Sequence, residues 1–190
     1  MIGKVKQRLI DHAGMVRTIN RLASEIIEEN LGVDNLALIG VRTRGAPLAD
    51  RIAEKIAKLE GRKIKVGVLD ITLYRDDFMT STGIPEVKAT EIPFDIHNLN
   101  LVLIDDVLFT GRTSREAIEA IMDNGRPSRI QLAVLIDRGH REMPIHGDYV
   151  GRKINISPGE EVRVKLKEID GIDEVVIVEA AQSSGLKANG

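Results

Sequence analysis

The stretch Leu101-Val-Leu-Ile-Asp-Asp-Val-Leu-Phe-Thr-Gly-Arg-Thr113 decides the fold of this chain. Its first four residues form a short, continuous apolar run, which is typical of a buried strand in a parallel sheet. Two adjacent carboxylates, Asp105 and Asp106, follow this run directly, and a turn of small and hydroxylated residues then leads to Thr113, which can cap a helix. The stretch therefore predicts a strand, a loop and a helix, with the polar residues at the carboxyl end of the strand.

The same order of elements recurs before this stretch. An apolar run at 36–41 predicts a buried strand, a polar turn follows at 42–45, and Pro47 then opens a helix that Gly61 ends. Helical spacing of apolar residues over 11–32 predicts an amphipathic first helix. Further strands are expected at 64–74, 129–136, 149–156, 162–167 and 174–179.

This alternation of strands and helices predicts an α/β domain with a mainly parallel sheet. Ligands of such sheets bind beyond the carboxyl ends of the strands, where the loops 42–45 and 105–113 both fall. We expect a single domain over 1–179 and a frayed C-terminal tail over 180–190.

Composition excludes several other classes of protein. The chain has 190 residues, of which 43% are hydrophobic and 29% charged, so disordered, collagenous and coiled-coil proteins all fit poorly. Its net charge of −2 does not indicate a nucleic-acid binder, so any basic face must be local. The absence of cysteine excludes disulfides, cysteine-ligated metals and a thiol nucleophile. Without an apolar signal region or a membrane span, we expect a cytoplasmic protein.

The acidic stretch has a chemical use. Backbone N–H groups over 110–113 are expected at a helix N-terminus, where glycine permits close approach, so they can bind phosphate. Asp105 and Asp106 repel each other unless a cation or hydroxyl donors lie between them, which suits sugar hydroxyls and Mg²⁺. The alternative is that they only end a strand and begin a turn. Their combination with Thr-Gly-x-Thr favours the functional interpretation.

The turn after the first predicted strand suits an anion. Gly40 and Gly45 have the spacing of P-loop glycines, but Ala and Pro follow where Lys and Ser or Thr would be needed, so a nucleotide triphosphatase fits poorly. The turn offers guanidinium groups and a hydroxyl to a different anion, although a solvated basic turn is about as plausible from the residues alone. The residues concerned are Arg42, Thr43 and Arg44.

Residues 101–113 closely resemble the phosphoribosyl pyrophosphate (PRPP) motif of the type I phosphoribosyltransferases. Three further blocks, at 39–45, 70–77 and 137–145, are similar to those of the PyrR family of bacterial pyr operon attenuation proteins, and the four blocks in this order are specific to that subfamily. The resemblance runs from about the first helix to residue 179. It implies a type I phosphoribosyltransferase fold with a flexible loop and a small hood.

The resemblance implies a uracil phosphoribosyltransferase, which makes UMP and pyrophosphate from uracil and PRPP with Mg²⁺ bound. Catalysis is then expected from Asp105, Asp106 and Arg44. Mg²⁺ is expected near the two aspartates, held mostly through PRPP and water. The PRPP-binding residues implied are Arg42, Thr43, Arg44, Asp105, Asp106, Val107, Leu108, Phe109, Thr110, Gly111, Arg112 and Thr113.

Two further segments carry implied roles. The long polar segment 75–92 resembles the family's flexible loop, which closes over bound substrate, and a disordered surface loop is the alternative. The residues assigned to the start of this flexible loop are Tyr74, Arg75, Asp76 and Asp77. The base is expected at Asp137, Arg138, Gly139 and His140. His140 is not expected to act as a general base, because this family does not depend on one for uracil.

The choice of base has an alternative. Related phosphoribosyltransferases with similar PRPP motifs act on hypoxanthine, guanine, adenine or orotate, so an enzyme that uses a purine base is the second candidate. A receiver domain, which also places acidic residues at strand ends, is an alternative from a different class, but it would leave Thr110-Gly-Arg-Thr113 unexplained.

The resemblance also implies RNA control, because PyrR proteins bind a stem-loop in pyr leader mRNA and UMP promotes that binding. Family members often carry Thr and His where this chain has Asn20 and Ser24, and Arg in place of His146, so a protein with catalysis alone is the alternative. A homo-oligomer is expected, since the family is built on dimers. The candidate RNA contacts are Arg17, Asn20, Arg21, Ser24, Arg141, His146, Arg152 and Lys153.

Overall fold

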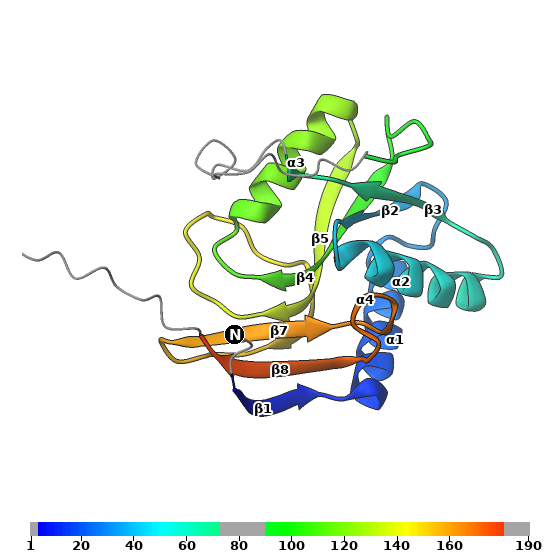
Figure 1. Ribbon diagram of the computed structural model, residues 1–190. Helices are drawn as coiled ribbons and strands as arrows, with labels where there is room; N and C mark the ends of the chain where they lie inside the picture. The colour runs from blue at the N-terminus through cyan, green and yellow to red at the C-terminus, as the bar shows by residue number, and fades with distance from the viewer. Residues whose placement is uncertain (1–3, 73–89, 181–190) are drawn as a thin grey trace, which may run out of the picture.

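Five parallel strands form the central sheet of the computed structural model, which describes residues 4–72 and 90–180 (Figure 1). The strand order is β3-β2-β4-β5-β6, and every pairing in it is parallel. The carboxyl ends of these strands therefore meet at one edge, as the sequence predicts for an α/β domain. The strands are β2 (Leu36–Val41), β3 (Lys65–Leu69), β4 (Asn100–Leu108), β5 (Arg129–Asp137) and β6 (Tyr149–Lys153).

Three long helices connect and cover the sheet. They are α1 (His12–Glu29), α2 (Gly45–Glu60) and α3 (Arg112–Asn124). The side chain of Asp11 accepts a hydrogen bond of 2.7 Å from the backbone N–H of Gly14, so Asp11 caps α1. Gly61 follows the last residue of α2, as predicted, and Gly125 follows that of α3.

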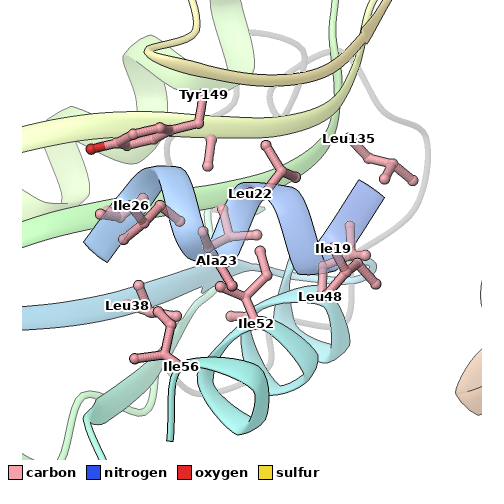
Figure 2. Close-up of a cluster of buried hydrophobic side chains, with 14 of the residues drawn as sticks. Ile19, Leu22, Ala23, Ile26, Leu38, Leu48, Ile52, Ile56, Leu135 and Tyr149 are labelled. Atoms are coloured by element: carbon pink, nitrogen blue, oxygen red, sulfur yellow. The ribbon is translucent and has the colours of Figure 1, made fainter. Parts of the chain in front are cut away.

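The two faces of the central sheet bury separate clusters of apolar side chains. Leu38 and Leu135 pack against α1 and α2 (Figure 2), whereas Ile39 and Leu103 pack against α3 on the opposite face. Successive residues of a strand point to opposite faces, so continuous apolar runs are needed where both faces are covered. This arrangement accounts for the burial of every residue of β2.

A second sheet has three antiparallel strands in the order β1-β8-β7. These are β1 (Val5–Ile10), β7 (Glu160–Lys165) and β8 (Glu174–Glu179), and the short helix α4 (Lys167–Asp170) joins β7 to β8. The sequence did not predict β1 or α4. Most of β1 is exposed, so it lacks the apolar pattern that would identify it, and its pairing with the distant β8 is what makes it a strand.

Several predicted boundaries were wrong. Strand β4 does not end at the aspartates but continues through them to Leu108, because Asp105 and Val107 pair with residues of β5. Helix α3 begins at Arg112 with Gly111 before it, so Thr113 is not its cap. Helix α2 begins at Gly45, which places Pro47 inside its first turn rather than at its start, a position that proline tolerates. Strand β3 ends at Leu69, well before residue 74.

Two predicted segments lie largely outside the described residues. They are the flexible loop, including Tyr74, Arg75, Asp76 and Asp77, and the C-terminal tail beyond residue 180. Within the described residues, none of the helices combines the length and the apolar character that a membrane crossing requires.

Candidate active site

A polar pocket of about 370 Å³ opens at the carboxyl edge of the central sheet. It is built from the segments that follow β2 and β3 and from the end of β4, which is where ligands of parallel sheets bind. It therefore brings together the acidic stretch and the basic turn, which lie about sixty residues apart in the sequence. The lining residues are Val41, Arg42, Thr43, Arg44, Asp70, Ile71, Thr72, Asp105, Asp106, Val107 and Thr113.

Two glycines allow the basic turn to lie directly on β4. A Cβ atom placed on Gly45 would be 2.2 Å from the carbonyl oxygen of Ile104, and one on Gly40 would be 2.5 Å from the carbonyl oxygen of Gly45. Neither backbone can move away without displacing the turn or the strand. The two glycines are therefore explained by close backbone approach next to Asp105, and not by a P-loop.

Burial dominates the electrostatics of the two aspartates. It raises the pKa of Asp105 well above the ordinary value, and the neighbouring charge of Asp106 raises it further. Burial also raises the pKa of Asp106, although the positive charge of Arg44 opposes this rise. The backbone N–H of Asp106 donates a hydrogen bond of 2.8 Å to Asp105. A ligand that supplies hydroxyl donors or positive charge would stabilise the ionised pair.

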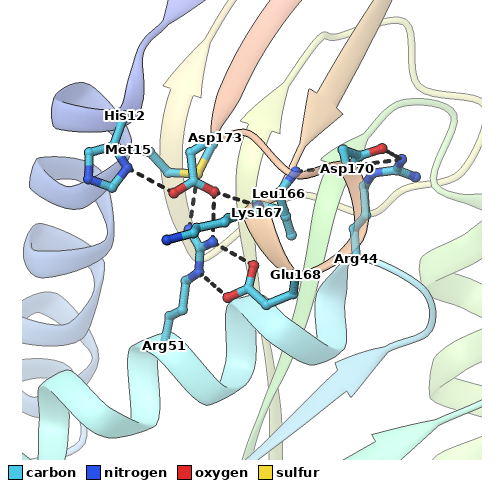
Figure 3. A network of polar contacts seen from close by, with 9 residues as sticks. All are labelled: His12, Met15, Arg44, Arg51, Leu166, Lys167, Glu168, Asp170 and Asp173. Atoms are coloured by element: carbon cyan, nitrogen blue, oxygen red, sulfur yellow. Dashed lines mark hydrogen bonds and ion pairs between the residues drawn. The ribbon is translucent and has the colours of Figure 1, made fainter.

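The two arginines of the turn are held by contacts outside it. Arg42 donates from its backbone N–H to the carbonyl oxygen of Leu69 at 2.9 Å, and its side chain lies 3.2 Å from Glu91. Arg44 forms an ion pair with Asp170 of α4, with 3.0 Å between Nη2 and Oδ1 (Figure 3). The Nε atom of Arg44 is buried without a hydrogen-bond partner among the described residues, and such an unsatisfied donor points to a ligand.

The rest of the predicted PRPP motif surrounds the N-terminus of α3. Gly111 at the N-cap has no side chain with which to cap the helix, and the Thr110 hydroxyl accepts a hydrogen bond of 3.3 Å from the N–H of Arg112, so an anion would meet the later N–H groups of the first turn. Thr113 lines the pocket, whereas Leu108 is buried in the core against α3. Four other predicted residues do not line the pocket: Phe109, Thr110, Gly111 and Arg112.

The predicted base-binding loop after β5 is hydrogen-bonded to the end of the PRPP motif. The backbone N–H of Arg138 donates to the carbonyl oxygen of Leu108 at 3.0 Å, and the carbonyl oxygen of Thr110 accepts from Glu142 at 2.9 Å. The side chains of Arg112 and Glu142 form an ion pair at 2.7 Å. These contacts fix the loop beside the motif although about thirty residues separate them.

Hydrogen bonds and an aromatic contact hold the predicted base-binding residues at the end of β5. Asp137 accepts a hydrogen bond of 2.6 Å from Arg141 and one of 3.0 Å from the N–H of Gly139. Burial by itself would raise the pKa of Asp137, but these hydrogen bonds outweigh it and lower the pKa. The guanidinium of Arg138 lies 3.8 Å from the centre of the Phe109 ring, and desolvation lowers its pKa. His140 is exposed and has a positive φ of 56°.

Some predicted RNA contacts gather around a separate hollow of about 570 Å³. Arg17 and Arg21 of α1 and Arg152 of β6 line it, together with Arg8 of β1, which the sequence analysis missed. Arg21 donates to the carbonyl oxygen of Gly151 at 2.5 Å, and Arg152 donates to that of Leu9 at 2.5 Å. Asn20 and Ser24 lie on the same helix but do not line this hollow.

The remaining predicted RNA contacts lie elsewhere. His146 lines a different hollow, of about 220 Å³, next to α3. Arg141 is wrapped into the loop after β5, where it donates to the carbonyl oxygens of Ile145 at 2.9 Å and Phe109 at 2.8 Å. Lys153 is exposed at the end of β6. The structure therefore does not bring all of these side chains onto the surface around the 570 Å³ hollow.

Two residues that line the pocket, and one that contacts Arg44 from outside it, were not predicted from the sequence. Asp70 and Thr72 line it, and Asp70 accepts hydrogen bonds of 2.8 Å and 2.5 Å from the backbone and hydroxyl of Thr72. The predicted strand 64–74 placed Asp70 inside a strand, whereas β3 ends at Leu69 and leaves Asp70 at the carboxyl edge of the sheet. No sequence signal pointed to Asp170, whose contact with Arg44 joins residues far apart in the chain.

The carboxylates of the pocket suit Mg²⁺ only if a bound ligand supplies further oxygen atoms to the ion. Within 4–72 and 90–180, no three side chains of His, Cys, Asp or Glu converge as a metal-binding group. Mg²⁺ commonly uses one or two carboxylates together with substrate phosphates and water. The two adjacent aspartates in an otherwise phosphate-compatible pocket fit that mode.

Comparison with known proteins identifies close relatives. The family model "Phosphoribosyl transferase domain" matches residues 7–169. Bifunctional protein PyrR of Pelotomaculum thermopropionicum is 54% identical over 95% of this chain and 100% of its own length. Bifunctional protein PyrR of Acetivibrio thermocellus is 56% identical over 90% of this chain and 94% of its own length.

Solved structures of more distant proteins share the fold. A hypoxanthine phosphoribosyltransferase from Staphylococcus aureus superposes with a TM-score of 0.68 at 18% identity, covering 92% of this chain and 93% of its own. One from Trypanosoma cruzi, a ternary substrates complex, gives a TM-score of 0.72 at 16% identity, covering 92% and 96%.

Proposed function

Because the chain belongs to the PyrR family of phosphoribosyltransferases, we propose that it transfers the 5-phosphoribosyl group of PRPP to N1 of uracil. The products are UMP and pyrophosphate. The observation that carries this proposal is the pocket in which a buried aspartate pair faces a turn with two arginines. Acidic and basic groups on opposing segments suit a substrate with ribose hydroxyls at one end and a pyrophosphate at the other.

Each side of the pocket has a role in the displacement at C1′. The bond from C1′ to the pyrophosphate oxygen breaks as the bond to N1 forms, and the ribose ring carries positive charge in between. Asp105 and Asp106 hold the ribose hydroxyls, whose donated hydrogen bonds offset the burial that raises the pKa of both carboxyls. Arg42 and Arg44 face the pyrophosphate, and catalysis comes from positioning and charge stabilisation without a protein nucleophile.

Mg²⁺ belongs to this proposal as a companion of PRPP. When bound, it supplies positive charge that neutralises the pyrophosphate oxygens. Asp105 and Asp106 would hold it mostly through water and the substrate, because no three acidic, histidine or cysteine side chains of the described residues converge as a metal-binding group.

We propose that the base binds at the end of β5 and the loop that follows it. Asp137, Arg138, Gly139 and His140 lie there, and Phe109 supplies an aromatic ring under Arg138. The hydrogen bonds between this loop and Thr110 support the placement, because they hold the loop next to the PRPP motif. The choice of uracil rests on family membership, and a purine base is the second candidate.

Regulation of pyrimidine synthesis is the second part of the proposal. The protein binds a stem-loop of pyr leader mRNA when UMP is bound, and transcription attenuation then follows pyrimidine supply. The hollow lined by Arg17, Arg21 and Arg152 supports an anionic partner on the face of α1.

We also propose that the protein works as a homo-oligomer. Light scattering at micromolar protein concentration tests this, and a monomer at that concentration would contradict the proposal.

A panel of bases with labelled PRPP tests the enzymatic proposal. We expect UMP from uracil and little product from hypoxanthine, guanine, adenine or orotate. If the protein prefers a purine base, that base rather than uracil is its substrate.

A gel shift with a pyr leader hairpin, with and without UMP, tests the regulatory part of the proposal. If protein that still makes UMP shows no UMP-stimulated binding, catalysis alone remains.

A further inference from the structure

The short helix α4 carries an acidic residue to one of the arginines of the pocket (Figure 3). Nη2 of Arg44 lies 3.0 Å from Oδ1 and 3.3 Å from Oδ2 of Asp170. Both side chains are largely covered, with 33% and 22% of their areas exposed. This contact joins the turn after β2 to the second sheet, and it is distinct from the aspartate pair of the pocket.

Asp170 is held in place by its own turn. Its Oδ2 accepts a hydrogen bond of 2.9 Å from the backbone N–H of Leu166, the residue before α4. Its backbone N–H donates to the carbonyl oxygen of the same residue at 2.6 Å. The carboxylate therefore keeps one orientation, and its second oxygen is directed at Arg44.

The turn that contains Asp170 is itself anchored on α2 at a second point. Arg51, two helical turns after Arg44, donates to both carboxylate oxygens of Glu168, at 2.8 Å and 2.6 Å. It also donates to Asp173 at 2.7 Å, and Asp173 accepts from the N–H of Lys167 at 2.9 Å. Because Arg51 fixes the turn, Asp170 presents a rigid anion to Arg44.

Within the described part of the chain, one donor of the Arg44 head group stays without a protein partner. Its Nε atom is buried and has no hydrogen-bond partner among the described residues. Its charge already acts on Asp106, where it opposes the effect of burial. A flexible arginine loses rotamer freedom when it binds an anion, and a partner that orders it beforehand removes part of that cost.

We propose that Asp170 is a positioning residue that orders Arg44 for the pyrophosphate group of PRPP. It touches no reacting atom and acts only through the guanidinium. The proposal rests on PRPP being the ligand of the pocket, which is part of the proposed function. The rival explanation is that the ion pair only attaches α4 to α2, as many partly exposed ion pairs do.

Asp170→Asn tests the proposal and Asp34→Asn is its matched control. Both replace the aspartate of an Asp–Arg ion pair by an amide of the same size, but Asp34 contacts Arg62, and neither of these two residues lines the pocket. Calorimetric titration with PRPP and Mg²⁺ measures binding without any base, so its result does not depend on uracil being the substrate. We expect Asp170→Asn to weaken PRPP binding about tenfold, the size of one ordered side chain.

Steady-state kinetics and a rescue variant complete the test. We expect kcat/KM for PRPP to fall about tenfold in Asp170→Asn, with KM for uracil unchanged and Asp34→Asn close to wild type in both. Asp170→Glu keeps the negative charge, so we expect it to recover part of the lost PRPP affinity. If Asp170→Asn does not fold, Asp170→Glu replaces it as the test variant, and its PRPP affinity should lie between those expected for wild type and for Asp170→Asn. Unchanged PRPP binding in a folded Asp170 variant, or an equal loss in Asp34→Asn, would overturn the proposal. Failure of wild type to bind PRPP would instead remove the proposed function itself.

Discussion

Gly45 lies so close to β4 that a Cβ atom on it would be 2.2 Å from the carbonyl oxygen of Ile104. We therefore expect Gly45→Ala to displace the turn that carries Arg42 and Arg44, because neither backbone can yield locally. Weaker PRPP binding should accompany a lower thermal midpoint. Calorimetry and thermal denaturation measure the two effects.

Gly61→Asn is the control for this variant. Gly61 has a positive φ of 71°, a Cβ atom added to it would meet nothing within 4 Å, and asparagine tolerates that backbone conformation. PRPP binding should stay at the wild-type level. Equal PRPP affinity in Gly45→Ala and wild type would show that the close approach does not position the turn.

Removal of the charge of Asp106 should reduce activity without reducing stability. We expect Asp106→Asn to lower turnover with uracil and PRPP by ~10²–10³, the usual effect of losing one preorganised polar contact to the transition state. Its thermal midpoint should equal or exceed that of wild type, since burial raises the pKa of Asp106 and the amide carries no charge. Exposed Asp95, replaced by Asn, is the control. Near wild-type turnover with unchanged Mg²⁺ dependence would refute the role of the carboxylates.

Asp173 should make the protein sensitive to acid. Burial alone would raise its pKa, but hydrogen bonds from Arg51, from the N–H of Lys167 and from His12 together lower it to about 2. Since the folded pKa lies below the unfolded value, the stabilisation is complete above about pH 4 and is lost as the pH falls towards 2. Its size is about 2 kcal/mol.

Urea unfolding of wild type and Asp173→Asn between pH 7 and pH 2.5 measures this contribution. We expect wild type to have the larger free energy of unfolding at pH 7 and the difference to shrink below pH 4. A difference that stays constant across this range would show that the ionisation of Asp173 is not its source.

Arg17 tests the proposed RNA surface with little risk to the fold. It is exposed, and no hydrogen bond or ion pair involves its side chain within the part of the chain that the structure describes. We expect Arg17→Gln to weaken binding of a pyr leader hairpin and to reduce the slope of log K against log salt by about one unit. Lys63→Gln, on a turn outside the hollow, should leave the slope unchanged. The same slope in both variants would remove Arg17 from the interface.

The sequence determined the parallel sheet and most of its ligand edge. Apolar runs such as 36–41 could only be strands covered on both faces, and the polar residues that follow them had to meet at the carboxyl edge. Asp105, Asp106 and the basic turn were therefore predictable as neighbours. The end of β4 was not predictable from the sequence, because the pairing of β4 with β5 carries the strand through both aspartates.

Only the tertiary structure decided the contacts that complete the site. Strand β1 has no apolar pattern and becomes a strand by pairing with β8. The partner of Arg44 is Asp170, 126 residues away, and the sequence offers many carboxylates that could have taken that place. Local periodicity reports which face of an element is buried, but ion pairs between distant segments depend on how the elements pack, and packing alone selected this one.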